Sequence, residues 1–126
     1  MRDRNPVQPA SSTPWAVLAV VAALVFVAYV RLRVADVPLE RDEGEYAYAG
    51  QLILQGIPPY ALAYNMKFPG TYYAYAAILA LFGHAPWGIH VGLLLVNAAS
   101  ILFVFAIGRR LFGSFAGAVA AVSFSI

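Results

Sequence analysis

A dense cluster of charged residues, Glu40-Arg41-Asp42-Glu43-Gly44-Glu45, lies between two long apolar stretches of this 126-residue chain. A carboxylate held next to a substrate hydroxyl can act as a general base, which typically accelerates a reaction by about 10²–10⁴-fold. Asp42 and Glu43 are therefore the candidate catalytic residues. Arg41 is a nearby candidate for an ion pair with the carboxylate that does not act as the base.

The same cluster also has a structural interpretation. Asp42 and Glu45 are three residues apart and have the form of a capping box, and acidic residues in a first helical turn complement the helix dipole. On a helix, Asp42 and Glu45 share one face, whereas Glu43 lies on a neighbouring face. The two interpretations are compatible, because a helix N-terminus also fixes a carboxylate rigidly.

A second polar group, Tyr64-Asn65-Met66-Lys67, follows further along the chain and precedes an apolar segment. Lys67 is the only lysine in the sequence. An isolated cation at a membrane surface suits a phosphate or a lipid headgroup, and ordinary snorkelling at a helix end is the alternative. His84 and His90 are isolated in the sequence, and neither is expected to act as a ligand.

The apolar composition of the chain predicts which kind of element carries these residues. Hydrophobic residues make up 62% of the chain and charged residues 11%, and the mean hydropathy is +0.73. Soluble domains contain about 45–50% apolar and about 25% charged residues. We therefore expect an all-α fold of multi-pass membrane helices. The scattered basic residues argue against nucleic acid as a partner, and the absence of cysteine excludes disulfides and thiolate metal sites.

The order of the elements follows from apolar runs of about 20 residues, which span a bilayer core as helices, and from the turn residues between them. Thr13-Pro14 is typical of a helix start, and Gly56 and Pro58-Pro59 end a short amphipathic helix. We expect a polar tail at 1–13 and a first transmembrane helix at 14–30. An outer loop at 31–86 follows, with two juxtamembrane helices at about 42–55 and 70–82. A second transmembrane helix is expected at 87–107, a cytoplasmic turn at 108–112 and the start of a third transmembrane helix at 113–126.

The basic residues predict the orientation of these segments. Arg2 and Arg4 precede the first span, and Arg109-Arg110 close the second, so both groups agree on the cytoplasmic side. Arg31 and Arg33 argue the other way. We expect a cell-membrane protein with a cytoplasmic N-terminus and residues 31–86 on the outer face. Because the chain stops within an apolar run, we also expect it to be the N-terminal portion of a larger protein or a truncated gene product.

The order of these motifs resembles the N-terminal portion of the GT-C-fold glycosyltransferases, the group that includes protein O-mannosyltransferases and aminoarabinose transferases. The resemblance runs from Trp15 to the end of the chain. It is carried by Asp42-Glu43 opening a short helix, by Lys67-Phe68-Pro69 before a tyrosine-rich helix, and by Gly108-Arg109-Arg110-Leu111-Phe112-Gly113 after a span. The family's Lys-Pro-Pro element is altered here, because Phe68 replaces its first proline.

The resemblance implies an enzyme that moves a sugar from a polyprenyl-phosphate donor to an acceptor outside the cytoplasm. It implies active-site roles for Asp42 and Glu43 and a donor-phosphate role for Lys67. By side-chain type, Tyr46, Tyr64 and Asn65 are candidates to contact the sugar or acceptor, and Arg41 is a further candidate for substrate contact. Tyr72, Tyr73 and Tyr75 are instead expected to form an interfacial aromatic belt. No metal-ligand spacing occurs in the sequence, so no cofactor is required, although a divalent ion held by the two carboxylates is compatible with related folds.

Two other function classes remain open from the sequence. One is a transporter or channel fragment whose outer acidic loop gathers cations, although such proteins usually place ionisable groups inside their spans. The other is a small structural membrane subunit without catalytic activity. The sugar, the acceptor and the oligomeric state are not specified by any of these residues.

Overall fold

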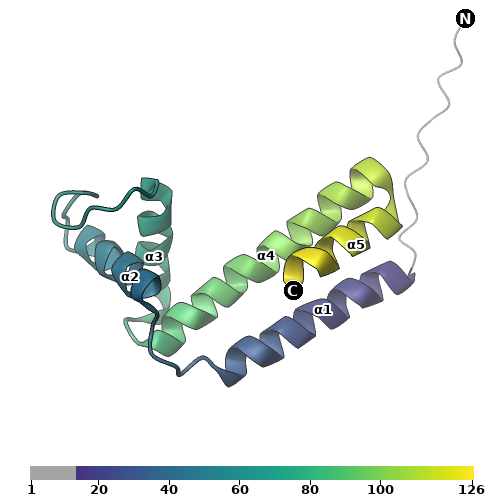
Figure 1. Ribbon diagram of the computed structural model, residues 1–126, viewed down its shortest axis with the longest axis horizontal. Coiled ribbons are helices and arrows are strands. Elements are labelled where there is room, and N and C mark those ends of the chain that lie inside the picture. Colours follow the sequence, from purple (N-terminus) through teal and green to yellow (C-terminus); the bar gives the residue numbers. More distant parts are fainter. Residues whose placement is uncertain (1–13) are drawn as a thin grey trace, which may run out of the picture. The chain divides into compact units, whose positions relative to one another are not determined.

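A computed structural model of the protein describes residues 14–126, and the predicted polar tail at 1–13 lies outside the described residues. The described part contains helices and no strands, which confirms the all-α prediction. Five helices follow one another along the chain (Figure 1): α1 (Pro14–Arg33), α2 (Arg41–Leu54), α3 (Pro69–Phe82), α4 (Pro86–Phe112) and α5 (Ser114–Ser125).

Two of these helices, α1 and α4, are long and apolar enough to cross a membrane. They contain 20 and 27 residues, and their most apolar windows have mean hydropathies of 2.3 and 2.4. Only 17% and 11% of those windows are buried within the protein, so most of their apolar side chains face outward as in a helix solvated by lipid. The α5 helix is apolar but has only 12 residues.

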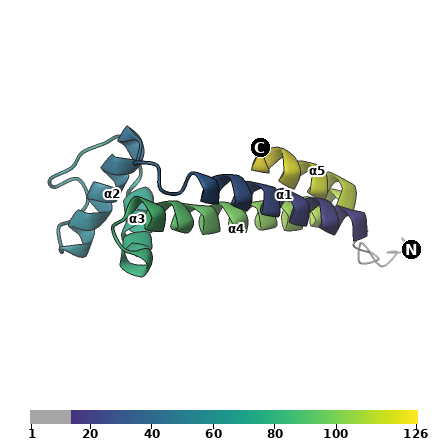
Figure 2. The same cartoon turned by 90° about the horizontal axis from the view of Figure 1, so that it is seen from below.

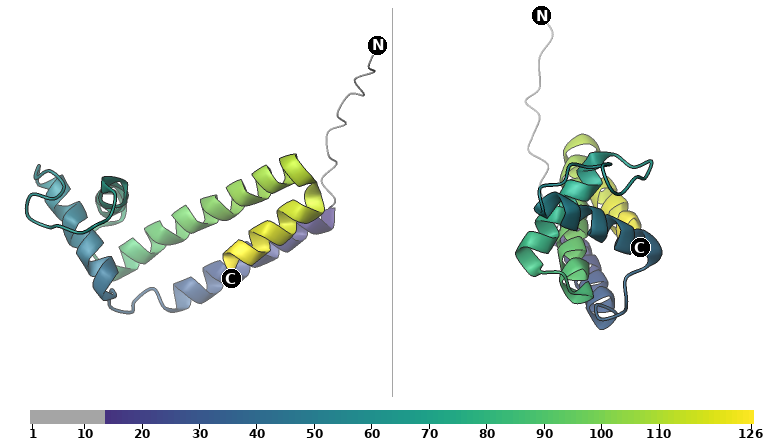
Figure 3. Two further views of the ribbon diagram at one scale, coloured as in Figure 1. Left: turned by 45° about the horizontal axis from the view of Figure 1, so that its top comes forward. Right: turned by 90° about the vertical axis from the view of Figure 1, so that its left-hand side faces the viewer.

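The described residues divide into two compact units. The first contains residues 14–28 and 97–126. Its core joins Ala16 and Val20 of α1 to Ile101 of α4 and to Ala118 and Ala121 of α5. After α4, the chain reverses and α5 runs back beside it (Figure 3).

This reversal in the first unit depends on glycine. Gly113 connects α4 to α5 with a φ of 91°, which a residue with a Cβ rarely adopts. A Cβ on Gly117 would lie 2.6 Å from the backbone nitrogen of Arg109, and a Cβ on Gly108 would lie 2.8 Å from the Cα of Gly117. The two helices therefore approach each other by backbone contact, as small residues allow in membrane helices.

The second unit contains residues 29–96, and α2 and α3 lie side by side in it (Figures 1 and 2). Tyr75 and Leu79 of α3 form its core with Ile89 of α4. Tyr72 and Tyr75 are only 1% and 6% exposed, so the prediction that they belong to an interfacial belt was wrong. They fill the space between α2 and α3, and only Tyr73, at 54% exposed, faces outward.

The contact between α2 and α3 is closest at Gly50. A Cβ at this position would lie 2.8 Å from the backbone nitrogen of Ala76, which cannot move without shifting α3. Gly50→Ala is therefore expected to destabilise the protein by about 1–3 kcal/mol, the usual cost of overpacking. Thermal unfolding of the detergent-solubilised protein, followed by circular dichroism, measures this change.

Gly44→Ala is the matched control for that substitution, because Gly44 lies in the same helix and a Cβ there would meet nothing within 4 Å. Alanine is a better helix former than glycine by about 0.8–1 kcal/mol, so this variant should be as stable as the wild type or more stable. Equal behaviour of the two variants would contradict the proposed close approach at Gly50.

Candidate functional site

The N-terminus of α2 is organised around Glu40 and Glu43. Glu40 is the N-cap residue, with extended backbone angles of φ −65° and ψ 165°, and Arg41 is the first helical residue. The Glu43 carboxylate reaches back to the cap and accepts a hydrogen bond from the backbone N–H of Glu40 at 3.3 Å. The predicted capping box of Asp42 and Glu45 was therefore wrong, because the helix begins earlier and its third position is Glu43.

Glu43 has a second partner in His90, which lies in the first turns of α4. The His90 Nε2 atom is 3.3 Å from Glu43 Oε2, and the His90 Nδ1 atom is 2.7 Å from the carbonyl oxygen of Ala35. A carbonyl only accepts hydrogen bonds, so Nδ1 is the donor in the second contact. The contact between Nε2 and Glu43 is then a hydrogen bond only when one further proton lies between those two atoms.

The contact with the Ala35 carbonyl holds the His90 ring in place, and the ring in turn holds the Glu43 side chain. The side chains of His90 and Glu43 are 18% and 30% exposed, so the pair is half-buried but still reached by solvent. Both nitrogens of the imidazole are engaged by protein groups, which leaves neither free to take a proton from a substrate. His90 thus orients the Glu43 carboxylate from α4.

Glu43 and His90 line a cavity of about 300 Å³, which we call the Glu43 cavity. Its other polar lining comes from Arg31 and Glu40, and its apolar lining comes from Val34, Val37 and Pro38. Asp42 is exposed and is not among these residues. Of the two adjacent carboxylates predicted from the sequence, Glu43 lines this cavity and Asp42 does not.

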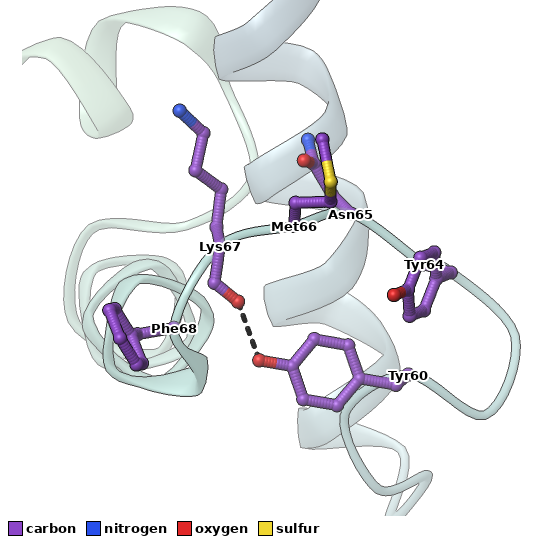
Figure 4. A pocket seen from close by; sticks show the side chains of 6 residues that line it. All are labelled: Tyr60, Tyr64, Asn65, Met66, Lys67 and Phe68. Atoms are coloured by element: carbon purple, nitrogen blue, oxygen red, sulfur yellow. Dashed lines mark hydrogen bonds between the residues drawn. The ribbon is translucent and has the colours of Figure 1, made fainter.

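A second cavity, of about 280 Å³, lies in the loop between α2 and α3 (Figure 4), and we call it the Lys67 cavity. It is lined by the predicted residues Tyr64, Asn65 and Lys67 together with Tyr60, Met66 and Phe68. The Tyr60 hydroxyl donates a hydrogen bond of 2.6 Å to the Lys67 carbonyl, and the Lys67 ammonium group points away from Tyr60. Tyr60 thereby holds the backbone of the loop while leaving the lysine side chain free.

The same loop is tied to the α2–α3 interface by tyrosines. The Tyr72 hydroxyl donates to the Asn65 carbonyl at 3.4 Å, and the Tyr60 and Tyr72 rings meet edge to face at 5.6 Å. Tyr60 adopts a φ of 69°, a left-handed conformation that is uncommon for a residue with a side chain. The hydrogen bond to Lys67 and the ring contact with Tyr72 compensate for this conformation.

Tyr46 was a candidate to contact substrate, but its ring packs between the rings of Tyr72 and Tyr75, at 6.2 and 5.6 Å. Burial, followed by the charge of Glu43 and the neighbouring Tyr46, raises the pKa of Tyr75 to about 12. Burial also raises the pKa of Tyr72, with Tyr60 and Glu45 contributing. Both shifts follow from the packing of Tyr72 and Tyr75 between α2 and α3.

Arg41 has no ion pair within 4.0 Å among residues 14–126. No group of three histidine or acidic side chains in the described part of the chain is placed to hold a metal ion. Sequence reasoning missed His90, although a histidine in the first turns of an otherwise apolar helix is a signal, because such a group is costly to bury without a partner.

Because the pKa of Tyr75 is raised in the folded protein, the stability of the fold is expected to fall at alkaline pH. An unfolded tyrosine has a pKa near 10, whereas the pKa of Tyr75 in the folded protein is about 12. Its contribution to stability is therefore complete below pH 10 and is lost as the pH rises from 10 to 12. Tyr75→Phe should make the loss of thermal stability over this range shallower, as measured by circular dichroism. The exposed Tyr73→Phe is the control, and an equal effect of both variants would contradict the assignment.

Comparison with known proteins adds no relative to this picture. No protein-family model matches the chain. No curated protein and no solved structure matches it either.

Proposed function

We propose that this chain is part of a membrane glycosyltransferase that moves a sugar from a polyprenyl-phosphate donor to an acceptor hydroxyl on the outer face of the membrane. The observation that carries the proposal is the Glu43 carboxylate, which is held by His90 and by the backbone of Glu40 and which lines a cavity. The resemblance to GT-C glycosyltransferases in the order of motifs gives the reaction class. The proposed activity is that of a complete enzyme to which this chain contributes the N-terminal portion.

The chemistry fits the groups at the Glu43 cavity. The acceptor oxygen forms a bond to the anomeric carbon of the sugar, and the bond from that carbon to the phosphate oxygen of the donor breaks. Glu43 accepts the proton of the acceptor hydroxyl, and the polyprenyl phosphate leaves with the electron pair of the broken bond. A carboxylate that is already oriented needs no rearrangement during this step.

Lys67 has the complementary role in the proposal. Negative charge grows on the phosphate as it leaves, and a positioned cation stabilises that charge more in the transition state than in the ground state. The ammonium group of Lys67 is free of protein partners among the described residues, and Tyr60 fixes the backbone that carries it. Tyr64 and Asn65 line the same cavity and are candidates to contact the donor.

The proposed topology follows from the two candidate spans. With α1 and α4 both crossing the membrane, residues between them lie on one side, together with both cavities. The arginines at the end of α4 favour the cytoplasm for that end, so the cavities would face outward. The outer face is also the side on which the proposed reaction uses its lipid-linked sugar.

Substitution of the two carboxylates tests the proposal and distinguishes them. In the full-length enzyme, Glu43→Gln should lower kcat for sugar transfer by about 10²–10⁴-fold, because the amide keeps the shape but accepts no proton. Asp42→Asn should lower kcat less than Glu43→Gln, since Asp42 is exposed outside the Glu43 cavity. The measurement is the steady-state rate of transfer of radiolabelled sugar at saturating donor lipid.

Glu45→Gln is the matched control for these two variants. It removes one negative charge from the same helix, but Glu45 lies toward Tyr72 and outside the Glu43 cavity. Its transfer rate should match that of the wild type, because it leaves the base and its partners in place. Full activity of the Glu43→Gln enzyme would rule out Glu43 as the base, and activity lost only in Asp42→Asn would assign that role to Asp42.

The role of Lys67 predicts a defect in donor use. Lys67→Ala should raise the KM for the donor lipid by about tenfold or more, as expected for loss of one hydrogen bond to a charged group. Lys67→Arg keeps the charge and should retain most of the donor affinity. Steady-state kinetics at varied donor concentration measure both variants, and an unchanged donor KM in Lys67→Ala would exclude the proposed contact.

A further inference from the structure

The loop between α2 and α3 carries large apolar side chains that the described protein leaves uncovered. Alternate residues of this loop, Leu62, Tyr64, Met66 and Phe68, are 66%, 78%, 91% and 89% exposed. We call these four residues the loop row. Exposed apolar residues that are scattered singly over a surface need no explanation, whereas a concentration of them marks an interaction surface. The loop row therefore calls for a partner.

The inner side of the loop is already occupied, so the loop row cannot be buried there. The Tyr60 hydroxyl donates a hydrogen bond to the Lys67 carbonyl (Figure 4), and the Tyr72 hydroxyl donates to the Asn65 carbonyl. The Tyr60 and Tyr72 rings also contact each other, and Tyr72 is only 1% exposed. These contacts fix the backbone that carries the loop row and leave its side chains on the outside.

The place of the loop in the chain favours lipid as the partner. α3 leads from the loop to Phe82, and α4, a candidate span, begins at Pro86. α3 contains 14 residues, which corresponds to about 21 Å at a rise of 1.5 Å per residue. With α4 in the bilayer, the loop row thus lies within about one helix length of the residues that enter the membrane.

Charge and residue type agree with a lipid surface. Every aspartate and glutamate of the chain precedes Tyr46, so the loop and α3 carry no carboxylate that lipid phosphates would repel. Lys67 is the only lysine, arginine or acidic residue between Tyr46 and Gly108, and its charge is positive. Aromatic side chains such as those of Tyr64 and Phe68 are enriched where a protein meets the interface of a membrane.

We propose that the loop row inserts into the interface of the lipid bilayer and anchors the α2–α3 pair to the membrane surface. Apolar side chains of such anchors reach about 5–10 Å into the boundary between headgroups and acyl chains. The loop backbone forms neither helix nor strand, and its polar groups need water or headgroups as partners, which keeps the insertion shallow. The anchor uses only apolar side chains, so it leaves the role proposed for Lys67 unchanged and does not depend on the transfer reaction.

Fluorescence from a single labelled site measures this insertion in the full chain. The sequence contains no cysteine, so Met66→Cys creates one site for the fluorophore NBD. The labelled protein is placed in nanodiscs of phosphatidylcholine and phosphatidylglycerol. Lipid with a spin label near its glycerol should quench the fluorophore at least about twofold more than lipid labelled at the chain end, because the insertion is shallow. Iodide, which stays in water, should quench it weakly.

Asp42→Cys is the matched control for the labelled site. The Asp42 side chain is charged and exposed at the other end of α2. A label there should be quenched by iodide and should not respond to spin-labelled lipid, because an ionised carboxylate stays in water.

Serine substitutions in the loop row test whether its apolar side chains cause the insertion. Phe68 is the N-cap of α3 and makes no side-chain cap hydrogen bond, and serine is a favoured N-cap residue, so Phe68→Ser should keep the helix. Combined with Leu62→Ser, it should increase iodide quenching of the label at position 66 by about twofold or more, since less apolar area favours insertion. Tyr48→Ser removes a side chain of α2 that is 51% exposed and should leave the quenching unchanged. Circular dichroism shows whether each variant keeps its helices.

Three results would overturn the anchor. Equal iodide quenching of the labels at positions 66 and 42 would place the loop in water. Protection of the label at position 66 from both iodide and spin-labelled lipid would mean that another protein segment covers the loop. An equal effect of Tyr48→Ser and of the serine pair in the loop would show that the loop row has no specific role. Loss of transfer in Glu43→Gln, combined with a loop in water, would keep the proposed function and remove only the anchor.

Discussion

The hydrogen bonds of His90 connect the start of α4 to two segments of the second unit that lie 55 and 47 residues earlier in the sequence. One ring nitrogen is bound to the carbonyl of Ala35 in the connection between α1 and α2, and the other is bound to Glu43 in α2. A half-buried imidazole in an apolar helix is expensive unless both nitrogens are satisfied. This requirement ties the start of α2 to the start of α4, and it places a carboxylate at the edge of a cavity.

The packing of α2 on α3 depends on a different constraint, which is the need to bury tyrosine rings at a close helix crossing. Gly50 permits the approach, and the rings of Tyr46, Tyr72 and Tyr75 pack against one another between the two helices. Because Tyr72 also binds the carbonyl of Asn65, the same cluster orders the loop that carries Lys67. Packing between two short helices thereby determines the position of a cation in a second cavity.

The sequence predicted the helical fold and the two long apolar helices, because composition and run length determine these features directly. It also grouped Tyr64, Asn65 and Lys67, which are close in the chain and line one cavity. It failed where the outcome depends on contacts over a long sequence separation. The pairing of Glu43 with His90 spans 47 residues, and no local pattern distinguishes Glu43 from Asp42 as its partner. Tyr72 and Tyr75 of α3 were misassigned for the same reason, since an aromatic run has the same sequence pattern in a membrane interface and in a helix crossing.

The arrangement also explains why the adjacent acids Asp42 and Glu43 differ in their contacts and exposure. Successive residues of a helix are about 100° apart around its axis, so Asp42 and Glu43 cannot both face His90. Glu43 gains two hydrogen bonds and a cavity, and Asp42 stays exposed. The cap at Glu40 contributes to this selection, because its backbone N–H binds the carboxylate at the third helical position, which is Glu43. The residue at which α2 begins therefore determines which of the two acids is held at the cap and lines the Glu43 cavity.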